Sequence, residues 1–317
     1  MKKIFSMLTI ACFTFGFAQL TEVKDQVKKA EWQAKNDTLP DGWQRHGTAS
    51  ILFNQSAFSN WVAGGVNNIA GNANIVYDAN YKKGDLTWDN RINLAYGLTK
   101  NEDQDFRKTD DRIEINSIVG KKAWGNWSYS FFANFRTQFT DGYDYDKDTD
   151  QNYPVSGFFK PAYLTFGPGM LWKKSDNLKF NLAPLTSKMT IISGDVYKVN
   201  PSYDANVAGS QPFLSSKDVE IYGVDAGDNL RYELGFYAAG YYKLQLMENI
   251  TMENILALYS NYLEDPQNVD MDYTMNLGMQ INKYLSTMLT VQLLYDDNAF
   301  PGLQVREVFG VGVTANF

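Results

Sequence analysis

The sequence of 317 residues contains one cysteine, Cys12, and one histidine, His46. A single cysteine cannot close an intramolecular disulfide, and a single histidine leaves no pair of imidazoles to share a metal ion. After the N-terminal segment, no apolar run approaches the ~18 residues that a membrane helix needs. The formal net charge is −7, whereas nucleic-acid binding needs a basic surface. These absences argue against a disulfide scaffold, a helical membrane protein and a nucleic-acid-binding protein, and nothing in the sequence indicates a cofactor.

The first residues predict a secretory signal peptide at 1–18. Two lysines precede an apolar run that ends in Gly16-Phe17-Ala18, with small residues at the two positions that signal peptidase reads. The run is too short to be a membrane helix. Cys12 raises the alternative of a lipoprotein site, but Thr9 stands where such sites have an aliphatic residue. We therefore expect an exported protein, cut after Ala18.

Residues 19–45 differ in composition from the rest of the chain. They are rich in charge, and Leu20, Val23, Val27 and Ala30 follow a helical spacing. This pattern predicts a short helix or tether in the periplasm, which could equally be a mobile tail or a plug. A turn is expected just before the next segment begins at His46.

Residues 46–317 alternate between apolar and polar side chains with the period of a β-strand. Aromatic residues make up 15% of the sequence although its mean hydropathy is −0.37. Strands with one side toward lipid and the other toward water produce this combination. The last strand ends in Phe317, and we expect it to pair with the first strand and remove the open edge. We count about twelve strands.

The connections between these strands alternate in length and charge. Short turns rich in lysine are expected near 82–85, 121–125, 173–177, 243–249 and 282–286, and longer loops near 55–65, 99–109, 140–156, 194–228, 263–269 and 296–304. Two of the longer segments, 141–152 and 194–228, each have a net charge of −4. A soluble β-sandwich does not explain this asymmetry, whereas an outer-membrane barrel does. The sequence thus predicts an all-β, transmembrane antiparallel barrel at 46–317, in the outer membrane of a Gram-negative bacterium.

Charged residues on the polar faces of the predicted strands are candidates for the lumen lining. Inside a narrow barrel they could line an aqueous pore and set its ion preference, or they could brace a packed polar core. Both alternatives stay open at this point. The candidates are Asp89, Arg91, Arg112, Glu114, Arg136, Arg231, Glu233 and Arg306.

Two loops invite functional hypotheses. Segment 194–228 is longer than a connection needs, and it could be a lid, a plug or a free surface loop. In the other loop, Asp144, Asp146, Asp148 and Asp150 alternate, and spaced carboxylates are what calcium prefers. However, Lys147 interrupts the series and the glycine of a calcium loop is missing. A solvated acidic loop is the better interpretation, so we expect no metal.

Three functions fit these features. The polar face suggests a passive channel for small solutes. A non-conducting accessory subunit of a larger outer-membrane complex is the second hypothesis. The third is a binder or conduit for an amphipathic ligand, because aromatic residues also occur on the nominally inner face: Phe132, Tyr237, Tyr241 and Tyr259. An enzyme is not expected, since His46 lies away from the long loops and Glu114 and Glu233 stand beside arginines.

Three motifs resemble a family of outer-membrane barrel proteins from Bacteroidota, the domain of unknown function 3078 family. They are Phe58-Ser59-Asn60-Trp61-Val62-Ala63-Gly64-Gly65-Val66-Asn67-Asn68, Leu182-Ala183-Pro184-Leu185-Thr186-Ser187-Lys188-Met189-Thr190, and residues 260–270 with Lys283-Tyr284-Leu285 and Leu294-Tyr295-Asp296-Asp297. One departure is Ser187, where glycine is expected and where a serine would tighten a turn. The resemblance implies a barrel and its location, but no activity.

The first motif also has a physical interpretation. Ser59 can cap a short helical turn that the two glycines end. We expect a structural anchor for the loop, with a ligand site as the alternative. The residues concerned are Asn60, Trp61, Gly64, Gly65 and Asn67.

Overall fold

The protein is described by a computed structural model that covers residues 41–58, 66–148, 150–204, 206–296, 298 and 300–317. No helix in this part of the chain is long and apolar enough to cross a membrane. The signal peptide and most of the segment 19–45 lie outside the described residues. Strand β1 begins at Gly42, four residues before the expected start at His46.

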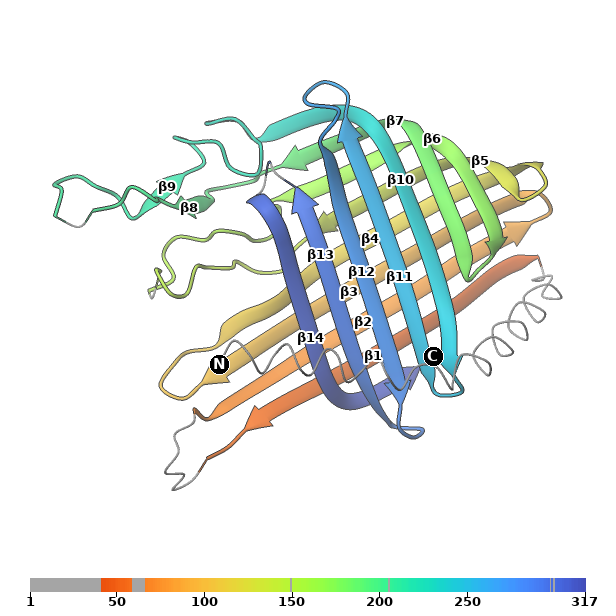
Figure 1. The fold of residues 1–317 in the computed structure, drawn as a ribbon, viewed down its shortest axis with the longest axis horizontal. Coiled ribbons are helices and arrows are strands. Elements are labelled where there is room, and N and C mark those ends of the chain that lie inside the picture. The colour runs from red at the N-terminus through yellow and green to blue at the C-terminus, as the bar shows by residue number, and fades with distance from the viewer. Residues whose placement is uncertain (1–40, 59–65, 149, 205, 297, 299) are drawn as a thin grey trace, which may run out of the picture.

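Twelve antiparallel strands close into a barrel in the order β1-β14-β13-β12-β11-β10-β7-β6-β5-β4-β3-β2 (Figure 1). This confirms the predicted fold and strand number. The strands are β1 (Gly42–Ser56), β2 (Asn68–Lys83), β3 (Leu86–Asn101), β4 (Arg107–Trp124), β5 (Trp127–Thr137), β6 (Ala162–Ser175), β7 (Leu178–Ile191), β10 (Leu230–Met247), β11 (Ile250–Asn261), β12 (Val269–Gln280), β13 (Leu285–Asp296) and β14 (Phe300–Asn316).

The barrel closes where the last strand pairs with the first, as the sequence predicts. Thr48 to Phe53 of β1 pair with β14. The backbones of Gly47 and Phe317 exchange two hydrogen bonds, of 2.7 and 2.8 Å. Every strand of the barrel therefore has two neighbours, and the seam between β1 and β14 is the shortest, with six paired residues on each strand.

Side chains alternate between the outer surface and the lumen. In β5, Tyr129 and Phe131 are exposed on the outside, whereas Ser130 and Phe132 are buried inside. Asn254 falls on the outer, apolar face, and its amide is satisfied there. It accepts a hydrogen bond from the Tyr273 hydroxyl at 2.8 Å and donates one to a backbone carbonyl. A polar group on the lipid-facing side therefore has partners within the sheet.

The two ends of the barrel differ in their connections. At one end, the turn end, the β2–β3, β4–β5 and β6–β7 connections are two residues long, and β1 begins and β14 ends there. At the other end, the loop end, the β5–β6 and β7–β10 connections occupy 138–161 and 192–229. The alternation of short and long connections has one exception. Only three residues join β13 to β14, so the expected loop at 296–304 is mostly strand β14.

Strand β7 contains a bulge at Pro184–Leu185. Gly235 of β10 pairs with Thr186 of β7, and Tyr237 of β10 pairs with Ala183 of β7. An advance of two residues along β10 is thus matched by an advance of three residues along β7. The register with β6 shifts in the same region. The bulge packs closely on β6, because a Cβ atom at Gly167 would lie 2.5 Å from the Leu185 carbonyl oxygen. One extra residue thus interrupts the regular geometry of strand β7.

This bulge changes which side chains enter the lumen. Lys179 and Lys188 are nine residues apart, and a regular strand would place them on opposite faces. With one extra residue between them, both line the lumen. Ser187 lies in this strand and not in a turn, which corrects the expectation from the sequence. Its hydroxyl lies 3.0 Å from the hydroxyl of Tyr232.

The two long connections form a cap that projects from the loop end (Figure 1). The β7–β10 connection contains a hairpin of β8 (Tyr197–Val199) and β9 (Phe213–Ser215). Its small core consists of Ile192, Val196, Ile221 and Val224. Tyr222 joins it to the β5–β6 connection by donating a hydrogen bond to the Val155 carbonyl at 2.7 Å, and burial raises the pKa of this tyrosine to about 12.

Candidate functional site

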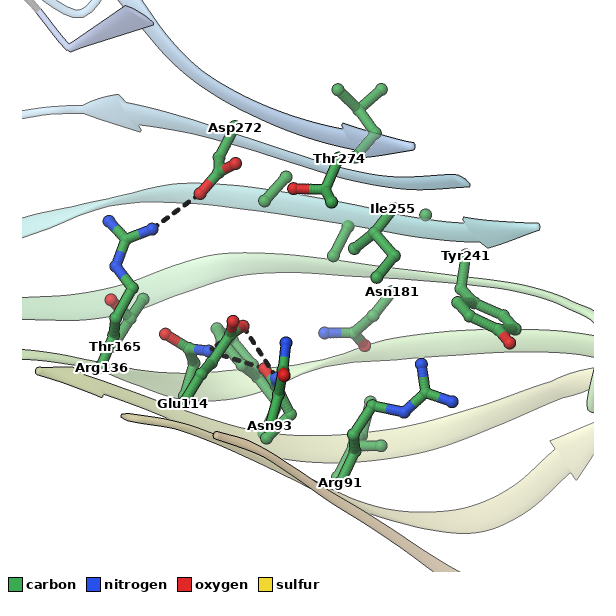
Figure 2. Close-up of a pocket in the computed structure, with 18 of the residues that line it drawn as sticks. Arg91, Asn93, Glu114, Arg136, Thr165, Asn181, Tyr241, Ile255, Asp272 and Thr274 are labelled. Atoms are coloured by element: carbon green, nitrogen blue, oxygen red, sulfur yellow. Dashed lines mark hydrogen bonds and ion pairs between the residues drawn. The ribbon is translucent and has the colours of Figure 1, made fainter. Parts of the chain in front are cut away.

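A cavity of about 460 Å³ follows the lumen, and Figure 2 shows part of its lining. The lining includes Lys188 and Asp296 at the loop end, and it also includes Asp176 and Asn177 in the turn between β6 and β7. The cavity therefore extends from one end of the barrel toward the other. Five of the eight predicted lumen residues line it: Asp89, Arg91, Arg112, Glu114 and Arg136.

An ion pair crosses the lumen near the loop end. Arg136 of β5 donates to Asp272 of β12 at 2.7 Å, and these strands lie in opposite walls (Figure 2). The guanidinium also lies 5.1 Å from the ring centre of Tyr163. A charge-assisted bond between opposite walls narrows the passage and fixes the separation of the walls.

A second crossing lies closer to the turn end. Arg91 bonds Asp78 on the neighbouring strand through two nitrogens, at 2.7 and 3.0 Å. The same guanidinium reaches within 3.8 Å of Glu253 on β11, across the lumen. Tyr241 completes the contact, since its hydroxyl donates to Glu253 at 2.9 Å and its ring lies under Arg91. Arg91 is therefore paired on both walls.

Toward the loop end, one lysine is surrounded by carboxylates. Lys188 lies 2.9 Å from Asp270, 3.3 Å from Glu233 and 3.8 Å from Asp296. These four residues, from β7, β12, β10 and β13, are named the Lys188 cluster. Arg231 borders it by contacting Glu233 at 3.4 Å. Three carboxylates around one ammonium leave this part of the lumen with an excess of negative charge.

The turn end contains the opposite arrangement. Asp89 of β3 accepts from Lys173 of β6 at 2.9 Å and from Lys179 of β7 at 3.2 Å. Asp176 lies 2.8 Å from Lys173. These four residues are named the Asp89 cluster. Its two lysines and two carboxylates balance.

The remaining predicted lumen residues have separate positions. Arg231 and Glu233 lie near the rim of the loop end, where Arg231 also pairs with Glu264 at 2.8 Å. Arg306 pairs with Asp110 of β4 at 2.5 Å. Arg231, Glu233 and Arg306 are thus outside the lining of the cavity that contains the other five. The ion pairs that these residues form brace the wall of the barrel.

The middle of the cavity is lined mainly by amide and hydroxyl side chains. In Figure 2, Asn93, Glu114, Asn181 and Thr274 lie between the Arg136–Asp272 pair and Arg91. We name this part the central section. Glu114 accepts hydrogen bonds from the amides of Asn116 and Asn134, at 2.9 and 3.4 Å.

The aromatic residues expected on the inner face do point inward, but the protein itself contacts their rings. Phe132 and Tyr237 stack with ring centres 4.6 Å apart. Arg91 and Lys179 lie over Tyr241, and Lys188 lies 4.9 Å from the ring centre of Tyr259. Rings occupied in this way do not favour an amphipathic ligand.

The loop motif and the acidic loop have structural contacts. Asn60, Trp61, Gly64 and Gly65 lie outside the described residues. Asn67 accepts a hydrogen bond from the Phe58 backbone at 2.6 Å and donates one to Glu102 at 2.9 Å, which joins two connections. This contact fits an anchor for the loop.

In the acidic loop, the carboxylates have different partners. Asp146 pairs with Arg107 at 2.9 Å. Asp148 accepts from the backbones of Asn152 and Tyr153, at 3.0 and 2.7 Å. Across the described ranges, no three His, Cys, Asp or Glu side chains are grouped so that they could hold a metal ion.

Sequence reasoning missed the lysines and six of the eight carboxylates that line the cavity. Lys173 was interpreted as part of the predicted turn at 173–177, and Lys179 follows that turn and was not among the candidates. Lys188 enters the lumen only because of the bulge in β7. Asp270 and Asp272 follow the period of β12 and could have been found from its alternation.

Comparisons with known structures find similarities at low sequence identity. The chain is similar to the translocator domain of the autotransporter NalP from Neisseria meningitidis, with 11% identity, 94% of this chain and 98% of that chain covered and a TM-score of 0.30. An outer membrane channel from Pseudomonas putida has 7% identity, coverages of 89% and 97% and a TM-score of 0.37. The NanC porin has 8% identity, with 84% of this chain and 98% of that chain covered and a TM-score of 0.35. Similarities at this level say nothing about what this chain binds or transports.

No curated protein sequence matches the chain. Residues 53–143 match the model of a family described as a protein of unknown function, DUF3078. This is the family that the motifs resemble, and the match includes the first of them, at 58–68. Over β2, β3, β4 and β5, the chain is therefore similar to that family of uncharacterised proteins.

Proposed function

We propose that this protein is a passive channel for small polar solutes in an outer membrane. The observation that supports the proposal is the cavity, lined by many charged and amide side chains, that reaches from Lys188 and Asp296 at the loop end to Asp176 and Asn177 at the turn end. A barrel that only needed a packed core would fill this space with side chains. Cross-lumen pairs such as Arg136–Asp272 make the passage narrow but leave it polar.

The outer surface supports insertion in a membrane. Aromatic residues with exposed side chains follow the turn end on the outside, where an aromatic girdle meets the headgroups of a bilayer. They include Trp43, Trp88, Trp124, Tyr129 and Tyr284. Between the two ends, exposed aliphatic residues such as Ile51, Ile75 and Val313 face outward. With the usual orientation of bacterial barrels, the turn end lies in the periplasm and the cap outside the cell.

The charges of the lumen favour a weak preference for cations. Eight carboxylates and six cationic side chains line the cavity. The sequence alone suggested that the arginines would set the selectivity. However, Arg91 and Arg136 are both paired with carboxylates, which cancels most of their field. The excess of carboxylates over cationic side chains, which is concentrated around Lys188, then determines the sign of the ion preference.

Planar-bilayer recording with purified protein tests this function. We expect discrete conductance steps and a reversal potential that indicates weak cation preference. Replacing Arg136 with alanine removes one positive charge and frees Asp272, so both conductance and cation preference should rise. The double variant Arg136→Ala, Asp272→Ala should raise conductance and return selectivity toward the wild type. A folded, inserted protein that conducts no current would contradict the channel and favour the accessory-subunit hypothesis.

A further inference from the structure

The central section contains a buried amide whose orientation is fixed from behind. Asn181 is only 5% exposed. The Ser130 hydroxyl, also buried, donates to its carbonyl oxygen Oδ1 at 2.7 Å. An amide held through its oxygen must present its nitrogen elsewhere, and Nδ2 of Asn181 has no hydrogen-bond partner in the protein. This leaves a buried, unpartnered hydrogen-bond donor in a side chain that lines the cavity.

A second amide supplies the complementary group. Oδ1 of Asn93 has no partner in the protein either, and both side chains line the cavity. Figure 2 shows that Asn93 and Asn181 come from different parts of the wall and extend into the same space. Buried polar groups without partners are costly, and they usually mark a place where another molecule supplies the missing bond. Here that molecule has to satisfy an acceptor and a donor.

Most charged groups around the central section are already paired, which disfavours an ionic occupant, although Arg112 also lines the cavity and its Nε has no hydrogen-bond partner. Arg136 is held by Asp272 on one side, and Arg91 is held by Asp78 and Glu253 on the other. Glu114 already accepts from two amides. A charged solute would have to compete with these bonds. A hydroxyl group both donates and accepts, so it can satisfy Asn93 and Asn181 without breaking any of them.

We propose that the central section binds a neutral polyhydroxylated solute of the size of a sugar, an inference that rests on the proposed channel function. Apolar side chains in the lining, such as Ile255, offer surface for its C–H groups. A cavity of about 460 Å³ accommodates a solute of this size. Asn93 and Asn181 would contact it directly, and Ser130 would position Asn181.

Three probes with the same carbon skeleton test the class of solute. Glucose is neutral, gluconate is an anion and glucosamine is a cation. Each is added to the purified protein in a planar bilayer, and the interruptions of the ion current are recorded against concentration. We expect glucose to interrupt the current at concentrations about tenfold lower than either charged probe, because only glucose leaves the ion pairs intact. Equal or stronger effects of a charged probe would overturn the proposal.

Substitutions test the residues. Asn181→Leu removes the fixed donor and should weaken the effect of glucose about tenfold. Ser130→Ala frees the amide to rotate and should cause a smaller loss. Asn254→Leu makes the same chemical change on the outer face, and it should leave both conductance and the glucose effect unaltered. If Asn181→Leu fails to fold, Asn93→Leu provides the same test through the acceptor. Unaltered glucose interruption in folded Asn181→Leu or Asn93→Leu would overturn the proposal.

The test distinguishes failure of the binding site from failure of the channel. Glucose binding to the detergent-solubilised protein is measured separately by saturation-transfer NMR. Binding without conductance would contradict the channel and uphold the site. Conductance without glucose binding would uphold the channel and overturn the site.

Discussion

The Lys188 cluster and the Asp89 cluster use the same residue types in opposite proportions. At the loop end, a single lysine lies among three carboxylates, of which Glu233 is almost completely buried. At the turn end, Asp89 lies between two lysines, and Asp176 supplies a further carboxylate. The first cluster has an excess of negative charge, and Lys188 is the one cation that contacts all three of its carboxylates. The second is balanced, and both Asp89 and Lys173 have two partners of opposite charge. The two ends of the lumen should therefore respond differently to the loss of one charge.

One strand connects the two clusters. Strand β7 contributes Lys179 to the Asp89 cluster and Lys188 to the Lys188 cluster. Both reach the lumen only because the bulge at Pro184–Leu185 inserts one residue between them. The bulge is thus the feature on which the whole charge arrangement depends.

Deleting Leu185 should have the largest effect. Without the bulge, regular pairing of β7 would turn either Lys179 or Lys188 toward the lipid. A lysine there is costly, about 2–4 kcal/mol at the membrane midplane, and the cluster it leaves would lose a cation. We expect most of the protein not to assemble, measured by the gel shift between heated and unheated samples. Leu185→Ala is the control, because it keeps the residue count and should assemble. A deletion variant that assembles as efficiently as wild type would contradict the role of the bulge.

Removing the lysine itself should have the next largest effect. Lys188→Met leaves Glu233, Asp270 and Asp296 close together without their common cation. Breaking a buried pair in this way costs about 3–5 kcal/mol, and access of water to the lumen should reduce the loss to about 3 kcal/mol. Urea unfolding in lipid vesicles, followed by tryptophan fluorescence, measures the change. Lys198→Met, in the cap, removes a lysine outside the lumen and should change the free energy of unfolding by less than about 0.5 kcal/mol.

The corresponding change at the turn end should cost less. Asp89→Asn keeps a hydrogen-bond acceptor for the two lysines, and Lys173 keeps its contact with Asp176 at 2.8 Å. We expect a loss of about 1 kcal/mol in the same unfolding measurement. A loss greater than that of Lys188→Met would show that the two clusters do not differ in the way that their charges indicate.

Much of the fold could be predicted from the sequence because a barrel has a simple rule. Alternation places Tyr129 and Phe131 outside and Ser130 inside, and the terminal strand at Phe317 has to close the sheet. The same rule found Asp89, Arg91, Arg112, Glu114 and Arg136 in the lumen lining. No bulge separates any of these residues from the nearby lumen-facing residues of its own strand.

The rest depended on contacts that local pattern does not encode. The extra residue in β7 reverses the faces of all later residues in the strand, so Lys188 could not be placed from alternation alone. The carboxylates that Arg91 and Arg136 contact across the lumen, Glu253 and Asp272, lie on β11 and β12, more than a hundred residues away in the sequence. Alternation along single strands therefore could not show that these arginines are paired. The expected loop at 296–304 was also wrong, because its proline and glycine belong to the beginning of β14.

The smallest expected effect concerns the direction of the current. Because the excess of carboxylates lies at the loop end, cations should be concentrated at that mouth, and a channel inserted in one orientation should pass slightly more current with one polarity. We expect a ratio of less than about twofold at 0.1 M salt, where screening acts over ~10 Å, and almost none at 1 M. Asp270→Asn reduces the excess and should reduce the ratio, whereas Asp176→Asn at the turn end should not reduce it. Single-channel recording at both salt concentrations measures these ratios. A ratio that persists at 1 M salt, or that falls equally with both substitutions, would mean that the asymmetry comes from the shape of the lumen and not from the Lys188 cluster.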